Sequence, residues 1–117
     1  MNMFNKEEAL SIWEHEMGKK EYAYDFAGKK IKFDAYLKNN EVGWVITFLR
    51  PLSLGGSNNL NNIIIMHHRT FNERNDQYPK FTIDEKEYIV HHNVNEDYYY
   101  LEKIIDDDND DDYGVIL

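Results

Sequence analysis

Residues 43–63 read GWVITFLRPLSLGGSNNLNNI, and the organisation of the chain follows from them. Residues 44–49 are aromatic, β-branched or aliphatic, which is typical of a strand, and Pro51 ends the run. Residues 52–62 contain a Gly-Gly pair and four Asn, so they predict a long loop. A second apolar strand is predicted at 63–66, followed by a short polar helix at 69–77.

A helix is predicted at residues 6–17, before this central region. Asn5 and Glu8 have the spacing of a capping box, and Gly18 suits the C-terminal cap. The apolar positions follow the rhythm of one buried helical face. They are Ala9, Ile12, Trp13 and Met17.

Short hairpins are predicted on both sides of the central region. Residues 22–26 and 31–33 alternate around a Gly-Lys-Lys turn, and residues 81–83 and 88–90 flank a charged turn. Residues 35–37 are predicted to form a brief helical turn. The expected fold class is therefore α+β, with an N-terminal helix, short β-hairpins, a strand–strand–helix core and an acidic C-terminal segment.

The length and composition predict one small cytoplasmic domain. A chain of 117 residues with nine Tyr, six Phe and two Trp supports a single modest core. The absence of cysteine excludes disulfides and thiolate zinc sites, and it favours a reducing compartment. No apolar run has the length of a signal sequence or a membrane span, so we expect a soluble protein.

The charge is concentrated at the C-terminal end. Residues 1–95 carry 12 Lys and Arg against 13 Asp and Glu, whereas residues 96–117 carry one Lys against nine acids. We therefore expect a single domain over 1–95 and an acidic, aromatic-flanked segment over 96–117 that packs on it or projects from it. The chain lacks the basic surface that phosphate binding requires, and a basic protein partner is the better expectation.

The central segment resembles the core of HNH-family endonucleases, in the small phage and bacterial form. The family pattern runs Trp, any residue, Ile, Asp-His, Ile, any residue, Pro, any residue, Ser, any residue, Gly-Gly, followed by a loop Asn, a strand and a helix. The matching positions are Trp44, Ile46, Pro51, Ser53, Gly55, Gly56 and Asn62. The likeness extends over roughly residues 9–92, and it implies a ββα core that grips a divalent metal over a phosphate.

The residues that perform the chemistry in that family are replaced here. The resemblance puts Thr47 at the metal-binding Asp and Phe48 at the general-base His. It puts Phe71, beside Asn72, at the ligand position of the helix. Phenylalanine neither accepts a proton nor binds a metal, so we expect no catalysis, no metal and no cofactor. The degenerate site consists of Thr47, Phe48, Asn62, His67 and Phe71.

Other possible metal ligands do not form a recognisable site in the sequence. His67-His68 and His91-His92 are adjacent pairs, whose side chains point to opposite faces if they lie in strands. The acidic run at 106–112 does not fit a calcium loop, because Tyr113 stands where the loop needs Gly and no Glu follows. We interpret these histidines as surface or hydrogen-bonded residues.

The acidic run is the second functional candidate. Apolar and aromatic residues flank it at 98–105 and 113–117, which is unusual for a disordered tail and favours strands that return to the body. A purely solvating role is the alternative. The predicted partner-binding residues are Asp106, Asp107, Asp108, Asp110, Asp111, Asp112, Tyr99 and Tyr100.

The predicted function is that of a non-enzymatic inhibitor or regulator. Its partner would be a nuclease or other protein with a basic nucleic-acid-binding groove, such as a restriction or CRISPR effector in a bacterial host of a phage. The tail would mimic nucleic acid, or the body would act as a decoy HNH domain. Four alternatives remain: an unrelated α+β domain, a residual metal-dependent nuclease, a subunit of a larger system, and a nucleic-acid-binding module that uses Lys29, Lys30 and Lys32.

Overall fold

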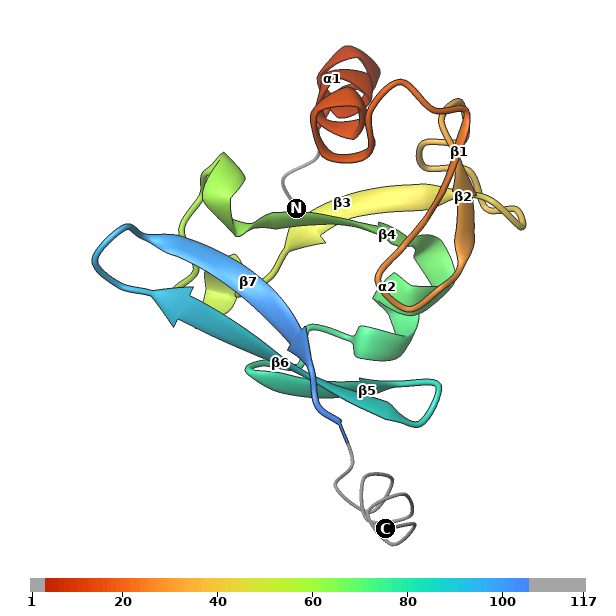
Figure 1. Ribbon diagram of the computed structural model, residues 1–117. Coiled ribbons are helices and arrows are strands. Elements are labelled where there is room, and N and C mark those ends of the chain that lie inside the picture. The colour runs from red at the N-terminus through yellow and green to blue at the C-terminus, as the bar shows by residue number, and fades with distance from the viewer. Residues whose placement is uncertain (1–3, 106–117) are drawn as a thin grey trace, which may run out of the picture.

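A computed structural model describes residues 4–105 and shows a mixed α+β fold, as the sequence predicted at the level of α+β (Figure 1). Three small antiparallel sheets are formed by β1 with β2, by β3 with β4, and by β5, β6 and β7. The elements are α1 (Lys6–Met17), β1 (Tyr22–Tyr24), β2 (Lys30–Lys32), β3 (Trp44–Phe48), β4 (Ile63–His67), α2 (His68–Arg74), β5 (Lys80–Ile83), β6 (Lys86–Asn93) and β7 (Tyr98–Lys103). Two 3-10 turns, η1 (Leu52–Leu54) and η2 (Leu60–Asn62), lie within the predicted long loop.

Helix α1 begins with the predicted capping box. The Asn5 side chain accepts a 2.8 Å hydrogen bond from the Glu8 N–H, and the Glu8 carboxylate accepts a 2.9 Å bond from the Asn5 N–H. Gly18 ends the helix with φ 82°, and its N–H donates to the Glu14 carbonyl. Trp13 is fully buried, and its ring lies 5.0 Å from that of Trp44. The helix is therefore fixed to β3 through an aromatic pair.

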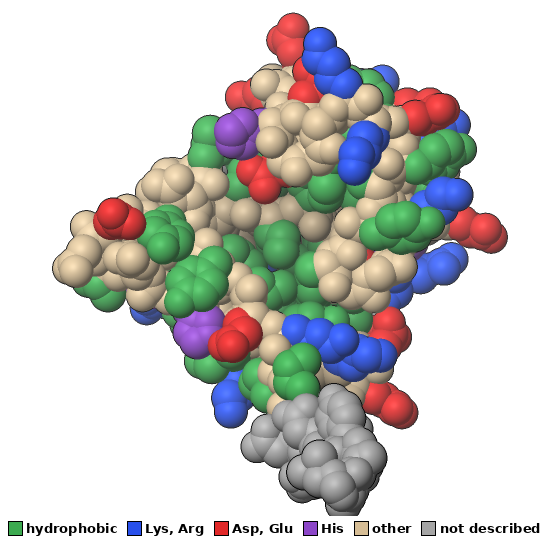
Figure 2. All heavy atoms as spheres, in the orientation of Figure 1, with side chains coloured by type: hydrophobic (Ala, Val, Ile, Leu, Met, Phe, Trp, Pro, Cys, Tyr) green, Lys and Arg blue, Asp and Glu red, His purple; other side chains and the backbone are tan. Residues whose placement is uncertain are grey.

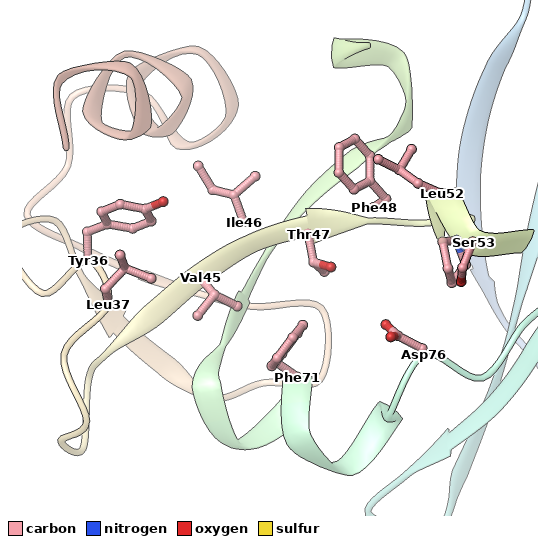
Figure 3. Close-up of a pocket in the computed structure, with 11 residues that line it drawn as sticks. Tyr36, Leu37, Val45, Ile46, Thr47, Phe48, Leu52, Ser53, Phe71 and Asp76 are labelled. Atoms are coloured by element: carbon pink, nitrogen blue, oxygen red, sulfur yellow. The ribbon is translucent and has the colours of Figure 1, made fainter. Parts of the chain in front are cut away.

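Strands β3 and β4 form the centre of the fold. They pair antiparallel from Trp44 opposite His67 to Phe48 opposite Ile63. Alternate side chains of β3 face the first core, which α1 covers in Figure 1. The intervening side chains face the side of α2 (Figure 3). This core consists of Ala9, Trp13, Ala23, Ile31, Ala35, Trp44, Ile46 and Ile65.

The last sheet holds a second core and includes a strand beyond the predicted hairpin. Strand β7 pairs with β6 from Tyr98 opposite Asn93 to Lys103 opposite Tyr88. Tyr99 is only 6% exposed and packs in a cluster with Leu49, Phe81, Ile83, Tyr88 and Val90. The segment expected to return to the body therefore does so over residues 98–103. Asp106 to Asp112 lie outside the described residues.

The predicted helical turn at residues 35–37 is wrong. These residues run beside the start of β3, where the Leu37 N–H donates to the Trp44 carbonyl at 2.8 Å and the Trp44 N–H donates to the Ala35 carbonyl. Burial explains the difference, because Ala35 is 2% exposed and the Tyr36 ring packs 4.9 Å from that of Trp44. The tertiary contacts override the weak local preference of a three-residue segment.

Candidate functional site

The candidate site is a pocket of about 380 Å³ beside β3. Figure 3 shows Val45 and Thr47 pointing from one face of β3 toward Phe71 of α2, whereas Ile46 and Phe48 point to the other face. Residues beside both ends of the strand complete the lining. These are Tyr36, Leu37, Pro51, Leu52, Ser53 and Asp76.

The pocket brings together three of the five residues assigned to the degenerate HNH site. Thr47, Phe48 and Phe71 line it, but Asn62 and His67 do not. Its oxygen-bearing side chains are those of Thr47, Ser53, Asp76 and Tyr36. Burial raises the pKa of Tyr36, whose hydroxyl donates a 2.7 Å hydrogen bond to the Phe4 carbonyl, so this phenol stays protonated at neutral pH. The lining is mainly apolar and is suited to binding apolar groups.

Asn62 holds the Gly-rich loop to the end of β3. Its side chain accepts a 2.9 Å bond from the Arg50 N–H and donates to the carbonyls of Arg50 and Ser57 at 3.0 and 2.9 Å. A Cβ on Gly56 would lie 1.9 Å from the Arg50 carbonyl oxygen, so only glycine fits there. The Asn62 side chain is fully buried, and all of its hydrogen bonds go to backbone groups.

Both ring nitrogens of His67 are occupied by backbone groups. Nδ1 accepts a 3.0 Å hydrogen bond from the Arg69 N–H and thereby caps α2, and Nε2 donates to the Glu41 carbonyl at 2.9 Å. This pair of partners selects the neutral tautomer with the proton on Nε2. Burial lowers the pKa of His67 below 6.5, and the ring is 2% exposed. His67 is thus held as a structural residue.

Protonation of His67 is expected to destabilise the fold. Because its pKa is lower in the folded than in the unfolded state, its contribution to stability is complete above pH 6.5 and is lost as the pH falls through the lowered value. The free energy of unfolding, measured with denaturant, should fall more between about pH 8 and about pH 5 for the native chain than for His67→Gln. The exposed-histidine control His15→Gln should behave like the native chain. Equal losses in the native chain and His67→Gln would contradict this account.

Asp25 is a buried carboxylate that the sequence analysis did not single out. One oxygen accepts from the Ala27 and Lys29 N–H groups at 3.0 and 2.9 Å. The other accepts from the His67 N–H at 3.0 Å and the Thr70 hydroxyl at 2.7 Å. Asp25 therefore joins the β1–β2 turn to the junction of β4 and α2. The position of Asp25 at the start of a turn can be recognised in the sequence. Its partners His67 and Thr70 are more than 40 residues away, and no local pattern indicates those contacts.

Arg74 is the second polar residue that the sequence analysis missed. Its guanidinium is 1% exposed and donates to the carbonyls of Phe48, Leu49 and Gln77, while Phe81 lies beneath it at 5.0 Å. Burial lowers the pKa of Arg74, and no carboxylate within residues 4–105 forms an ion pair with it. Arg74 links the end of α2 to the end of β3.

The two histidine pairs differ. His68 begins α2 rather than continuing β4, so the strand condition for opposite faces does not apply to this pair. Its ring stacks on that of His67 at 4.5 Å. In β6, His91 stacks on Tyr100 and His92 on Tyr99. His92 also holds the β6–β7 turn through a 2.9 Å contact with Asp97, and this hydrogen bond lowers the pKa of Asp97.

The two tyrosines assigned to partner binding have different environments. Tyr99 belongs to the core and is not a surface contact, because it is 6% exposed. Tyr100 is 48% exposed and remains accessible. The six Asp residues of the same assignment lie outside the part of the chain that the structure describes.

Comparisons with known proteins give no relative. No family model matches the sequence, and neither a curated protein nor a solved structure matches it. Neither helix within residues 4–105 is long and apolar enough to cross a membrane. Over the same residues, no group of three or more His, Asp or Glu side chains is arranged to hold a metal ion.

Proposed function

We propose that this protein is a non-enzymatic inhibitor or regulator that binds a nuclease or another nucleic-acid-handling protein. The observation that carries the proposal is the apolar pocket formed by Thr47, Phe48 and Phe71, the positions that correspond to catalytic and metal-binding residues in the HNH pattern. The antiparallel β3–β4 pair followed directly by α2 supports descent from an HNH-like ββα core. A pocket with this lining would bind apolar groups of a partner and would not hydrolyse nucleic acid.

The charge distribution supports the choice of partner. Residues 106–112 contain six Asp and no basic residue, whereas residues 1–95 are nearly neutral. On the face shown in Figure 2, acidic and basic side chains are interspersed around a hollow lined with hydrophobic side chains. A partner with a basic groove for phosphates would attract the acidic segment far more strongly than the body. Restriction and CRISPR effectors of bacteria are the partners that we favour.

Removing the acidic run is expected to abolish capture of such a partner. A chain ending at Ile105 keeps β7 and its buried Tyr99, whereas an earlier end point would also damage the second core. The intact chain, the shortened chain and a version with the six Asp changed to Asn are used as bait in host lysate. We expect only the intact chain to retain a nuclease or nucleic-acid-binding protein, and to release it as the salt concentration rises.

Other results of this experiment would redirect the proposal. Equal capture by all three chains would place the binding surface on the body and contradict tail mimicry. Retention of nucleic acid without protein would contradict the inhibitor function. It would favour the outer face of the β1–β2 hairpin, where the Lys30 ammonium lies 4.4 Å above the exposed Tyr22 ring. Such an arrangement of basic and aromatic groups suits single-stranded nucleic acid.

A further inference from the structure

Strand β3 has one edge that β4 does not cover. The N–H and carbonyl of Trp44 point away from β4 and bond to the carbonyl of Ala35 and the N–H of Leu37. Outward and inward groups alternate along an antiparallel strand, so Ile46 and Phe48 also point outward. The Leu49 N–H supports this assignment, because it bonds to Asn62 on the β4 side.

The outward groups of Ile46 and Phe48 are largely unpaired. Within residues 4–105, the N–H and the carbonyl of Ile46 form no hydrogen bond, and neither does the N–H of Phe48. The Phe48 carbonyl accepts a 2.8 Å hydrogen bond from Arg74. Unpaired strand edges are templates for another strand. Over the described residues, the chain uses this edge at Trp44 through residues 35–37 and at the Phe48 carbonyl through Arg74. Both backbone groups of Ile46 and the N–H of Phe48 form the free edge.

The pocket has the form required by an added strand. It extends along the free edge and includes side chains from both faces of β3, with Val45 and Thr47 on one side and Ile46 and Phe48 on the other. Successive side chains of a strand point to opposite faces. A strand added here would therefore place apolar side chains against both pairs.

The charge at one margin of the pocket narrows the identity of the occupant. Asp76 is exposed and lines the pocket, and no basic side chain within residues 4–105 forms an ion pair with it. A cationic side chain of the occupant would complement this carboxylate. The backbone edge, the apolar lining and Asp76 together describe an extended peptide with alternating apolar residues and one Lys or Arg.

We propose that the free edge of β3 docks such an extended segment of a partner protein by strand addition. The backbone of the segment pairs with both groups of Ile46 and with the N–H of Phe48. Its apolar side chains occupy the pocket, and its basic residue lies beside Asp76. This recognition mode goes beyond the proposed function, because it uses neither the acidic run nor a basic groove. Main-chain hydrogen bonds supply affinity, and the pocket supplies specificity.

The test uses a phage-displayed library of random heptapeptides selected on the intact protein. Enriched peptides are synthesised, and their affinities are measured for the intact chain, Thr47→Trp and Asp76→Lys. Thr82→Trp and Glu96→Lys are matched controls on exposed positions away from the pocket. We expect peptides with alternating apolar residues and one Lys or Arg, weakened about tenfold or more by either pocket variant and unchanged by the controls.

Amide hydrogen exchange locates the bound peptide. Exchange at Ile46 and Phe48 should be fast in the free protein and slow in the complex, because both N–H groups gain a partner. The proposal is overturned if no peptide is enriched, if Thr47→Trp binds the peptides as the intact chain does, or if the two amides remain fast in the complex. Protection that grows with protein concentration without peptide would also overturn it, since a second copy would then occupy the edge.

Discussion

Replacing Arg74 by methionine is expected to lower the free energy of unfolding by about 3 kcal/mol. The guanidinium satisfies three carbonyl groups, those of Phe48, Leu49 and Gln77, and methionine leaves all three without this donor. The side chain is also packed between α2 and Phe81, so its loss removes contacts between the central strands and the last sheet. Denaturant unfolding followed by circular dichroism measures the change.

Arg69 provides the matched control on the same helix. It is exposed, and Arg69→Met should change stability by less than about 0.5 kcal/mol. Arg74→Lys should remain destabilised, because one ammonium group does not reproduce the planar fork of the guanidinium. Equal stabilities of Arg74→Met and Arg69→Met would show that Arg74 does not hold α2 against β3.

Replacing Asp25 by asparagine is expected to cost about 2–4 kcal/mol in unfolding free energy. The carboxylate accepts four hydrogen bonds, two at each oxygen. In asparagine, an NH2 group replaces one carboxylate oxygen. It cannot accept the two hydrogen bonds made to that oxygen, so their donors are left without an acceptor. The loss should appear as a lower denaturant midpoint with an unchanged slope.

A double-mutant cycle with Thr70 separates the network from general damage. Thr70→Val removes the hydroxyl that donates to Asp25, and its effect should be much smaller in the Asp25→Asn background than in the native chain. Asp34→Asn, at an exposed carboxylate, is the matched control and should be nearly neutral. Simple additivity of Asp25→Asn and Thr70→Val would contradict a shared network.

Short sequence patterns were sufficient to predict α1 and β3. The Asn5 capping box and Gly18 defined α1, and the apolar run with Pro51 defined β3. The three consecutive tyrosines at 98–100 illustrate the limit. An unbroken aromatic run has no apolar–polar alternation, so nothing in it distinguishes the buried Tyr99 from the exposed Tyr100.

The polar framework of the site was not predictable in the same way. Asp25 meets His67 and Thr70 across more than 40 residues, and Arg74 meets Phe48 across 26. Such pairs arise from the chain path and leave no short-range spacing. The resemblance to the HNH pattern assigned Thr47, Phe48 and Phe71 to one site, and all three line the pocket. It did not indicate that His67 caps α2 instead of facing that pocket.

The central claim is that this protein binds a partner protein and does not cut nucleic acid. The direct measurement is cleavage of plasmid DNA and single-stranded DNA and RNA by the purified chain with Mg²⁺, Mn²⁺ or Zn²⁺, beside samples treated with chelator. We predict no cleavage above the chelated samples with any of the three metals. Metal-dependent cleavage that co-elutes with the protein and is lost in Thr47→Trp, but not in Thr82→Trp, would contradict the account and identify the pocket as an active site.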